Sequence, residues 1–281
     1  MQDRFKLGIV GYGFVGKAVS YGFQHRDVDQ YIIDPKLGTT LNNLPEDCDV
    51  VFVCLPTPMG ADGRIDSSIL EDVYTDLRDY VSNDTLIVIK STITPDIVNN
   101  FAQRGVVYNP EFLAEKNALY DFVNPQFHVF GGYDDDALYL ERVYDVYSLC
   151  NPCHVFRVSH IDASFIKYGI NTFLATKVTF FNQLYDCVNK EPDANFAAVI
   201  AVIGSDSRIG PSHTKVPGFD GKRGFGGACF PKDCTALVTY DNSLTLIRES
   251  IRINNEYRST YELDEREKAQ NVHYEQTQKE Q

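Results

Sequence analysis

The first half of the chain alternates short apolar runs with longer amphipathic stretches. We interpret the apolar runs as buried strands and the stretches between them as helices, because their apolar positions recur at helical spacing. The predicted strands are Lys6–Val10, Gln30–Ile33, Val50–Cys54, Thr85–Ile89, Val106–Tyr108, His128–Phe130 and His154–Arg157. The predicted helices are Val15–Gln24, Ser68–Val81, Pro95–Phe101 and Asp135–Tyr147. This alternation is typical of an α/β fold with a doubly wound parallel sheet, which binds ligands beyond the carboxyl ends of its strands.

After residue 160 the pattern becomes helical. The stretch Asp162–Val188 has no proline and a single glycine, which predicts one long helix, and further helices are expected at Asn195–Ile203 and Leu244–Tyr257. The remainder, Ser259–Gln281, is charged and rich in glutamine, which favours a frayed helix or a disordered tail. The predicted parts are a Rossmann-type domain, an all-helical central domain and a polar tail, over residues 1–160, 161–258 and 259–281.

A glycine-rich turn, Gly11–Gly16, directly follows the first predicted strand, and the second strand ends in Asp34. In this strand–turn–helix–strand setting the three glycines allow a tight turn, close approach of a pyrophosphate and close packing of helix on strand. Asp34 can accept hydrogen bonds from both ribose hydroxyls, and its charge repels a 2′-phosphate. The sequence therefore predicts a dinucleotide site that prefers NAD to NADP. The alternative is a glycine-rich turn that binds nothing.

A second glycine-rich segment, Gly224–Asp233, contains a cysteine. Glycine lets a backbone approach a ligand closely, and Pro231 suits the first turn of a helix. If a helix begins there, its positive end and Lys232 both favour the thiolate form of Cys229. We interpret the segment as a substrate loop that presents a nucleophilic cysteine. The alternative is a buried structural cysteine beside a turn.

Lys167 and Asn171 stand four residues apart on the long predicted helix, so they share one face. The helix is apolar on more than one side, which predicts that both side chains are buried. A buried lysine and amide need polar partners, and such partners suggest a functional role.

Composition excludes several classes of protein. The 281 residues carry a net charge of −13, which argues against nucleic-acid binding, and no apolar run approaches the ~20 residues of a membrane span. The first residues lead straight into a strand, unlike a signal peptide. The seven cysteines are scattered and odd in number, which favours reduced thiols and a cytoplasmic location.

The run from Cys150 to His154 has the CxxCH spacing of c-type haem attachment. That attachment belongs to exported proteins, so we interpret the run as a turn that enters a strand. A redox pair or half of a zinc site stays open, although no second ligand pair is placed to complete a zinc site. We therefore predict no metal.

Taken in order, these blocks resemble the UDP-glucose/GDP-mannose dehydrogenase family from about Lys6 to Tyr257. The matching blocks are Gly11–Gly16, Leu55–Pro58, Asp62–Asp66, Lys90–Thr92, Asn109–Glu115, Lys167 with Asn171, Ser207–Gly210 and Gly224–Asp233. The resemblance implies an NAD-dependent enzyme that oxidises the C6 alcohol of a nucleotide sugar to a carboxylate, as from UDP-glucose to UDP-glucuronate. It also implies two successive hydride transfers and a homodimer formed through the long helix.

The family's functional residues map onto this chain. Cys229 would attack the aldehyde, giving a thiohemiacetal and then a thioester. Lys167 and Asn171 would stabilise charge on the oxygen at C6, and Asp233, Glu115 and Thr92 would handle water and protons. The implied cofactor residues are Gly11, Gly13, Phe14, Val15, Gly16, Asp34, Thr57, Ser91, Thr92, Glu115 and Lys232. The implied substrate residues are Glu111, Phe112, Leu113, Lys167, Asn171, Gly224, Phe225, Gly226 and Arg208, the last reaching a neighbouring subunit's substrate.

Family members continue into a second Rossmann-like domain that binds the UDP group, and this sequence stops soon after Ile253–Glu256. We expect one of three situations: a more open site, a lid from another chain, or a truncated phage or viral form with little activity. Two rival functions also remain. A β-hydroxyacid dehydrogenase of the 6-phosphogluconate type would transfer one hydride and need no cysteine, which the Cys229 loop argues against. An NAD-binding regulator would have no turnover.

Overall fold

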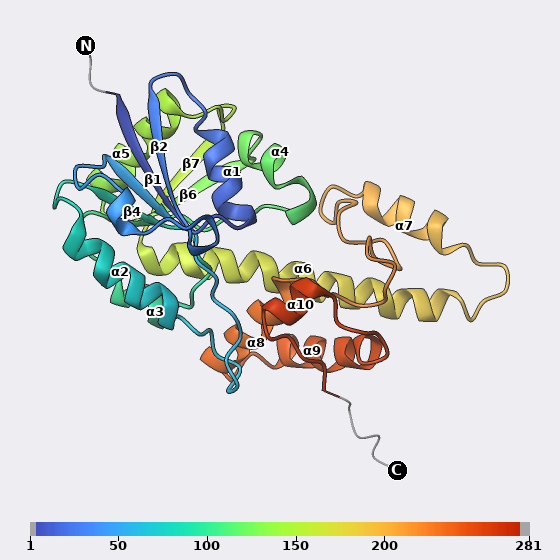
Figure 1. Cartoon of the computed structure of the whole chain (residues 1–281). Helices are drawn as coiled ribbons and strands as arrows, with labels where there is room; N and C mark the ends of the chain where they lie inside the picture. The colour runs from blue at the N-terminus through green and yellow to red at the C-terminus, as the bar shows by residue number, and fades with distance from the viewer. Residues whose placement is uncertain (1–3, 276–281) are drawn as a thin grey trace. The chain divides into compact units, whose positions relative to one another are not determined.

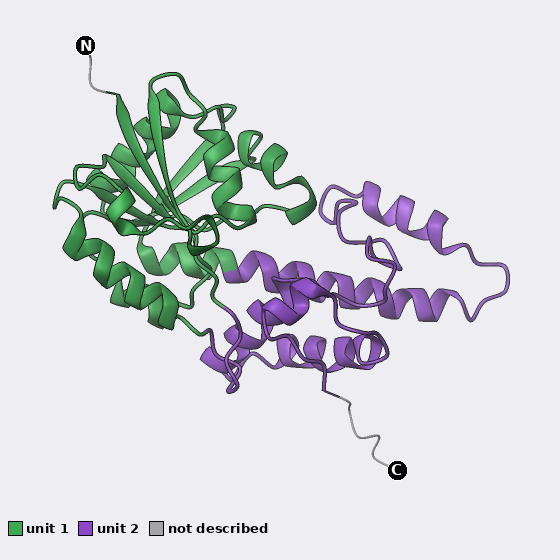
Figure 2. Cartoon of the chain, in the orientation of Figure 1, with its two compact units in different colours: residues 1–57, 66–167 green, residues 58–65, 168–281 purple. Residues whose placement is uncertain are grey.

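The computed structural model describes residues 4–275, and the chain divides into two compact units (Figure 2). Unit 1 comprises residues 1–57 and 66–167, and unit 2 comprises residues 58–65 and 168–281. The division therefore falls inside the long helix rather than at its start. The first turns of that helix belong with the sheet, because the hydroxyl of Ser164 donates to the carbonyl of Ile93 at 2.8 Å.

Unit 1 is built on a seven-stranded sheet, and every predicted strand is present. The strands are β1 (Phe5–Val10), β2 (Val28–Ile33), β3 (Val50–Val53), β4 (Leu86–Ile89), β5 (Val106–Tyr108), β6 (Phe127–Gly131) and β7 (His154–Val158). Their order is β2-β1-β3-β4-β5-β6-β7, so the chain reverses its direction of winding between β1 and β3. The expected parallel sheet is confirmed except at one place. Strand β6 pairs antiparallel with β5, through Tyr108 and Gly131 alone.

Helices cover both faces of this sheet (Figure 1). The helices α1 (Phe14–Gly22), α4 (Ala118–Val123) and α5 (Asp134–Tyr147) lie on one face, and α2 (Ser68–Tyr80) and α3 (Pro95–Asn100) lie on the other. The short helix α4 escaped the sequence analysis. Three 3-10 turns complete the unit, at Pro35–Leu37, Leu41–Asn43 and Glu115–Asn117.

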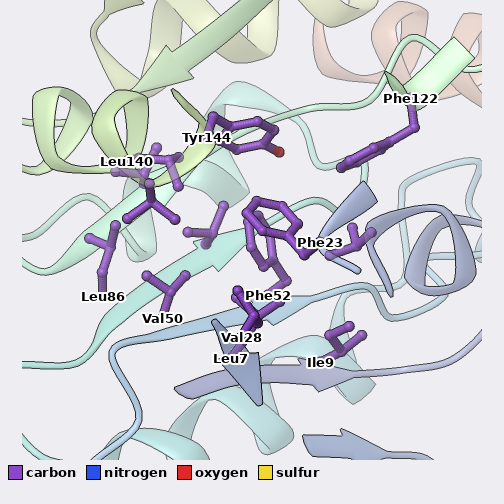
Figure 3. Close-up of a cluster of buried hydrophobic side chains, with 14 of the residues drawn as sticks. Leu7, Ile9, Phe23, Val28, Val50, Phe52, Leu86, Phe122, Leu140 and Tyr144 are labelled. Carbon is purple, nitrogen blue, oxygen red and sulfur yellow. The ribbon is translucent and has the colours of Figure 1, made fainter. Parts of the chain in front are cut away.

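One core of unit 1 lies between the sheet and the first group of helices (Figure 3). Alternate strand residues such as Leu7 and Phe52 point into it, as the period of two in a strand requires. Phe23 packs against Phe52 and Tyr144 with ring centroids 5.3 and 5.1 Å apart. Each fully buried side chain of this size contributes about 1.5–3 kcal/mol. This packing fixes the strands, and with them the polar residues that follow the carboxyl ends of β3 and β4.

A buried polar network ties the ends of β4 and β5 together. The ammonium of Lys90 donates to the carbonyl and side-chain oxygens of Asn109, at 3.1 and 2.9 Å. The hydroxyl of Tyr144 donates to the same side-chain oxygen at 3.0 Å. Burial lowers the pKa of Lys90 to about 8. These contacts fix the backbone just before the loops that follow both strands.

Unit 2 is helical. It contains most of α6 (His160–Val188), together with α7 (Phe196–Ser205), α8 (Phe230–Tyr240), α9 (Thr245–Arg258) and α10 (Glu265–Ala269). The predicted long helix and its two predicted successors are confirmed. A small hairpin at residues 58–65, closed by an antiparallel bridge between Met59 and Ile65, also belongs to this unit.

The segment after α9 differs from the frayed or disordered tail that its composition suggested. Within residues 259–275, Glu265–Ala269 form α10, and Glu267 and Val272 are buried, at 1% and 3% exposure. The buried guanidinium of Arg258 attracts this segment, since it lies 3.8 Å from a carboxylate oxygen of Glu267. The rest of the predicted tail, residues 276–281, lies outside the described residues.

Candidate functional site

The glycine-rich turn has the geometry that its sequence predicts. Gly11 has a φ of +90°, where only glycine is relaxed, and a Cβ on it would lie 2.5 Å from the carbonyl oxygen of Cys54. A Cβ on Gly16 would lie 2.0 Å from the carbonyl oxygen of Gly11. Gly13, which precedes the first residues of α1 (Phe14 and Val15), has open space around its missing Cβ. A pyrophosphate group fits that open space, at the positive end of a helix.

Asp34 is anchored beside the same turn. Its carboxylate accepts from the backbone N–H of Tyr12 at 2.7 Å and from that of Lys36 at 2.8 Å. The bond from Tyr12, followed by that from Lys36, lowers the pKa of this carboxyl group below its ordinary value. Asp34 is therefore charged near neutral pH. It lies within one hydrogen bond of the turn, where a ribose attached to the pyrophosphate would be.

The ends of β3 and β4 meet next to the turn. The hydroxyl of Ser91 donates to the carbonyl of Leu55 at 2.8 Å, and the hydroxyl of Thr57 donates to the carbonyl of Thr92 at 2.8 Å. Both strands end at the edge where the sheet reverses its winding, which is where doubly wound sheets bind ligands. The structure thus brings together the predicted cofactor residues that belong to β1–β4. Glu115 follows β5, at the start of a 3-10 turn.

Lys167 and Glu111 form a buried ion pair in unit 1. The ammonium of Lys167 lies 3.1 Å from a carboxylate oxygen of Glu111 and donates to its carbonyl oxygen at 2.5 Å. The second carboxylate oxygen accepts from the N–H of Leu113 at 2.7 Å, and Lys167 also lies over the ring of Phe112 at 5.4 Å. The predicted burial of Lys167 is confirmed. Sequence reasoning did not foresee its partner, because the two residues are far apart along the chain.

Unit 2 holds a second buried polar cluster, at the start of α8. Cys229 is the N-cap residue of this helix, so the predicted helix start is confirmed. The fully buried carboxylate of Asp233 accepts from the side chain of Asn171 at 2.6 Å and from the ammonium of Lys232 at 2.7 Å. The charge of Lys232, which the sequence argument placed beside Cys229, is thus compensated by Asp233. Lys232 belongs to this cluster in unit 2, whereas the other predicted cofactor residues lie in unit 1.

The loop that leads to Cys229 is held by side chains through its backbone. The N–H of Gly224 donates to the side-chain oxygen of Asn182 at 3.1 Å. Asn254 accepts from the N–H of Phe225 at 2.6 Å and donates to its carbonyl at 2.9 Å. Asn254 lies within a block that the sequence analysis quoted, but nothing in the sequence connected it or Asn182 with the loop. A backbone fixed in this way presents Cys229 in one position.

The remaining predicted residues have different surroundings. Arg208 follows α7, and its guanidinium pairs with Asp206 at 2.6 Å. The side chain of Arg208 is 87% exposed.

The thiol of Cys150 donates to the carbonyl of Phe122 at 3.1 Å, and burial raises the pKa of Cys150 and of Cys153. The CxxCH run leads into a strand as predicted, since β7 begins at His154, although residues 150–153 form no regular turn. Within residues 4–275 no group of three or more metal-binding side chains comes together, and no helix is long and apolar enough to span a membrane.

The seven-stranded sheet, the glycine turn at its winding reversal and the anchored Asp34 together define a dinucleotide-binding α/β protein of the Rossmann type. The chain belongs to the UDP-glucose/GDP-mannose dehydrogenase family. Residues 35–150 match the family's NAD binding domain and residues 162–256 match its central domain, and the two ranges together cover more than half of the chain. The first match begins after the glycine turn, so the evidence for the turn is its own geometry.

Curated proteins similar in sequence to this chain support the same family. UDP-glucose 6-dehydrogenase of Rickettsia bellii is 33% identical over 210 residues, which is 72% of this chain and 47% of that protein. UDP-glucose 6-dehydrogenase YwqF of Bacillus subtilis is 31% identical over 223 residues, covering 74% of this chain and 48% of that protein. The chain therefore spans about half the length of the curated relatives that it matches.

Solved structures agree on the fold. A UDP-glucose dehydrogenase from the archaeon Pyrobaculum islandicum superposes with a TM-score of 0.77 at 25% identity, over 89% of this chain and 68% of that one. The 3-hydroxyisobutyrate dehydrogenase of Mycobacterium tuberculosis superposes with a TM-score of 0.64 at 17% identity, over 88% of this chain and 91% of that one. The second likeness shows the shared fold alone.

Proposed function

We propose that this chain carries the NAD-binding and cysteine-bearing parts of a nucleotide-sugar 6-dehydrogenase. Its substrate class is a UDP-hexose of the UDP-glucose type, whose C6 alcohol is oxidised to a carboxylate. The observation that carries the proposal is Cys229 at the N-cap of α8. Lys232 and Asp233 follow it on the same helix, and Asp233 also binds Asn171 of α6 in a buried cluster. A single hydride transfer needs no such cysteine, so this loop favours a two-step oxidation.

The proposed chemistry has two stages. NAD⁺, held by the residues of unit 1, would supply the acceptor for the hydride that leaves C6 in each stage. In the first, the C6 hydroxyl loses its proton and the carbon becomes an aldehyde. The thiolate of Cys229 then adds to the aldehyde carbon, forming a C–S bond and a thiohemiacetal. Loss of the second hydride leaves a thioester, and water cleaves it to a carboxylate and the free thiol. The covalent bond keeps the aldehyde from escaping between stages.

The polar groups around these steps have proposed roles that follow from their charges. Lys167 can stabilise negative charge on the C6 oxygen, and Glu111 holds its ammonium in place until then. Asn171 can donate a hydrogen bond to the same oxygen. Asp233 would accept a proton from the hydrolytic water, and the donors Asn171 and Lys232 would keep its carboxylate oriented. Glu115 and Thr92, in unit 1, are proposed to handle water and protons, as the family resemblance implies.

The remaining cofactor, substrate and partner assignments stand as proposals. Gly11–Gly16, Asp34, Thr57 and Ser91 would hold NAD in unit 1. A homodimer through α6 is supported by the exposed aromatic side chains on this helix, Phe173 and Phe180, at 68% and 57% exposure. The proposed location is the cytoplasm, where free thiols such as those of the seven cysteines stay reduced.

The proposed function is tested by counting NADH produced per nucleotide sugar consumed. Two NADH for each UDP-glucose, with UDP-glucuronate as product, is the expected result. One NADH per substrate would instead support a β-hydroxyacid dehydrogenase type of reaction. Full NAD binding without NADH formation from a panel of nucleotide sugars would support a regulator.

Asp34 is expected to decide the choice of cofactor. Replacing it with serine removes the charge that repels a 2′-phosphate, so the preference for NAD over NADP should fall by roughly a hundredfold. Binding calorimetry with both cofactors measures this change. Asp29→Ser is the matched control, because Asp29 lies on β2, the strand that Asp34 directly follows, and pairs with Arg4. Equal affinities for NAD and NADP in the unaltered chain would contradict the prediction.

A further inference from the structure

A cluster around Glu267 ties the α10 segment, residues 259–275, to the cysteine loop. Glu267 is 1% exposed, and one of its carboxylate oxygens accepts from the N–H of Gly227 at 3.2 Å and from the hydroxyl of Tyr274 at 2.7 Å. The other oxygen accepts from the N–H of Asp264 at 2.9 Å, within the capping box of α10. One carboxylate thus joins the helix start, the loop and Tyr274.

Arg258 holds the other end of the same loop. It is 2% exposed, and its guanidinium donates to the carbonyl of Gly224 at 3.0 Å and pairs with Asp220 at 2.8 Å. Two of its nitrogens, Nε and Nη1, are buried without a hydrogen-bond partner. A buried guanidinium in this state depends on nearby negative charge, and Asp220 at 2.8 Å and Glu267 at 3.8 Å both supply it.

The loop packs directly on this pair. A Cβ on Gly226 would lie 2.6 Å from the guanidinium carbon of Arg258 and 2.6 Å from a carboxylate oxygen of Glu267. A cavity of about 210 Å³ in unit 2 is lined by Phe225 and Pro231 on the loop side and by Tyr274 among others. On its other contacts Phe225 packs in a small apolar core with Ala175 and Cys234, so this packing and the polar contacts to Arg258 and Glu267 together fix the position of the loop.

We propose that Glu267 and Arg258 are positioning residues, which lock the Gly224–Gly227 loop and so place Cys229 for its nucleophilic step. The inference rests on the proposed function for its consequence in catalysis, but the locking itself is a property of the fold. The α10 segment then acts as a latch on the cysteine loop. Its residues carry no family motif, and sequence reasoning assigned them to a polar tail.

The test is the rate at which iodoacetamide alkylates each cysteine, followed by peptide mass spectrometry. Both carboxylate oxygens of Glu267 accept from N–H groups, one from Gly227 and the other from Asp264. In Glu267→Gln one of these oxygens is replaced by an NH₂ group, which would face one of these N–H groups in either orientation of the amide. We expect Cys229 to react about tenfold faster in this variant, because the released loop samples more open positions. The exposed Cys187 should keep its rate. Glu265→Gln is the matched control, since Glu265 lies on the same helix with an 89% exposed side chain, and it should change nothing.

Two outcomes would contradict the proposed latch. The first is an alkylation rate of Cys229 in Glu267→Gln that stays within twofold of the rate in the unaltered chain. If the buried Cys234 also becomes reactive, unit 2 has unfolded, and Tyr274→Phe decides instead because it removes a single hydroxyl from Glu267. Tyr274→Phe should then raise the alkylation rate of Cys229 and leave that of Cys234 unchanged. The second contradicting outcome is an unchanged alkylation rate of Cys229 in Tyr274→Phe.

Kinetics separate this inference from the proposed function. If the chain forms NADH, Glu267→Gln should lower kcat while the KM for NAD stays unchanged, because the NAD-binding residues belong to unit 1. If the unaltered chain forms no NADH, the proposed function fails, and the alkylation rates still decide whether the latch exists.

Discussion

Replacing Cys229 with serine is expected to stall the second half of the oxidation. A serine hydroxyl has the shape of the thiol, but it is a far weaker nucleophile at neutral pH, so the aldehyde is not captured and activated as a thioester. We expect kcat for complete oxidation to fall by about a thousandfold or more. Mass spectrometry after incubation with UDP-glucose and NAD should detect an aldehyde-level or ester-like adduct rather than free UDP-glucuronate.

The matched control is Cys187→Ser, which changes an exposed thiol near the end of α6 and should leave turnover unaltered. NAD binding should survive in both variants, because the residues proposed to hold NAD, other than Lys232, lie in unit 1. Complete four-electron turnover by Cys229→Ser would remove the nucleophile from the proposed mechanism. One NADH per sugar in the unaltered chain would do the same.

The parts of the fold that the sequence predicted are those whose signals are local. Each strand of unit 1 is an apolar run whose neighbours along the chain are polar or glycine-rich, so its existence can be read without knowing its partners. The glycine turn and Asp34 are local in the same sense, because one βαβ unit contains the turn, the helix start and the acid. Cys229 was found because Pro231 marks a helix start within two residues of it.

The parts that the sequence did not predict depend on contacts between distant residues. Glu111 and Lys167 form one ion pair only after the sheet and α6 have assembled. The antiparallel direction of β6 depends on the path through α4, whose apolar positions are too few to show a period. Glu267 is the sharpest case. It stands in a charged, glutamine-rich stretch, and its burial depends on the N–H of Gly227, the hydroxyl of Tyr274 and the buried guanidinium of Arg258.

Two glycine-to-alanine substitutions in the glycine turn should distinguish its contribution to stability from its contribution to NAD binding. In Gly16→Ala the new Cβ would lie 2.0 Å from the carbonyl oxygen of Gly11, a backbone atom that cannot move cheaply. We expect a loss of about 3 kcal/mol or more in the free energy of unfolding, measured by urea denaturation followed by circular dichroism. The chain has no tryptophan, so fluorescence of that residue cannot report the transition.

Gly13→Ala is the matched substitution at the same turn, and it should act on NAD alone. No atom lies within 4 Å of its missing Cβ, and its φ of −70° suits alanine, so its unfolding free energy should stay within about 0.5 kcal/mol of the unaltered chain. The added methyl group occupies the space that a pyrophosphate needs, so NAD affinity should fall at least about tenfold in binding calorimetry. Unaltered NAD affinity in Gly13→Ala would mean that the pyrophosphate does not approach this turn. Unaltered stability in Gly16→Ala would mean that α1 can move away from β1 without loss, contrary to the tight packing that the third glycine allows.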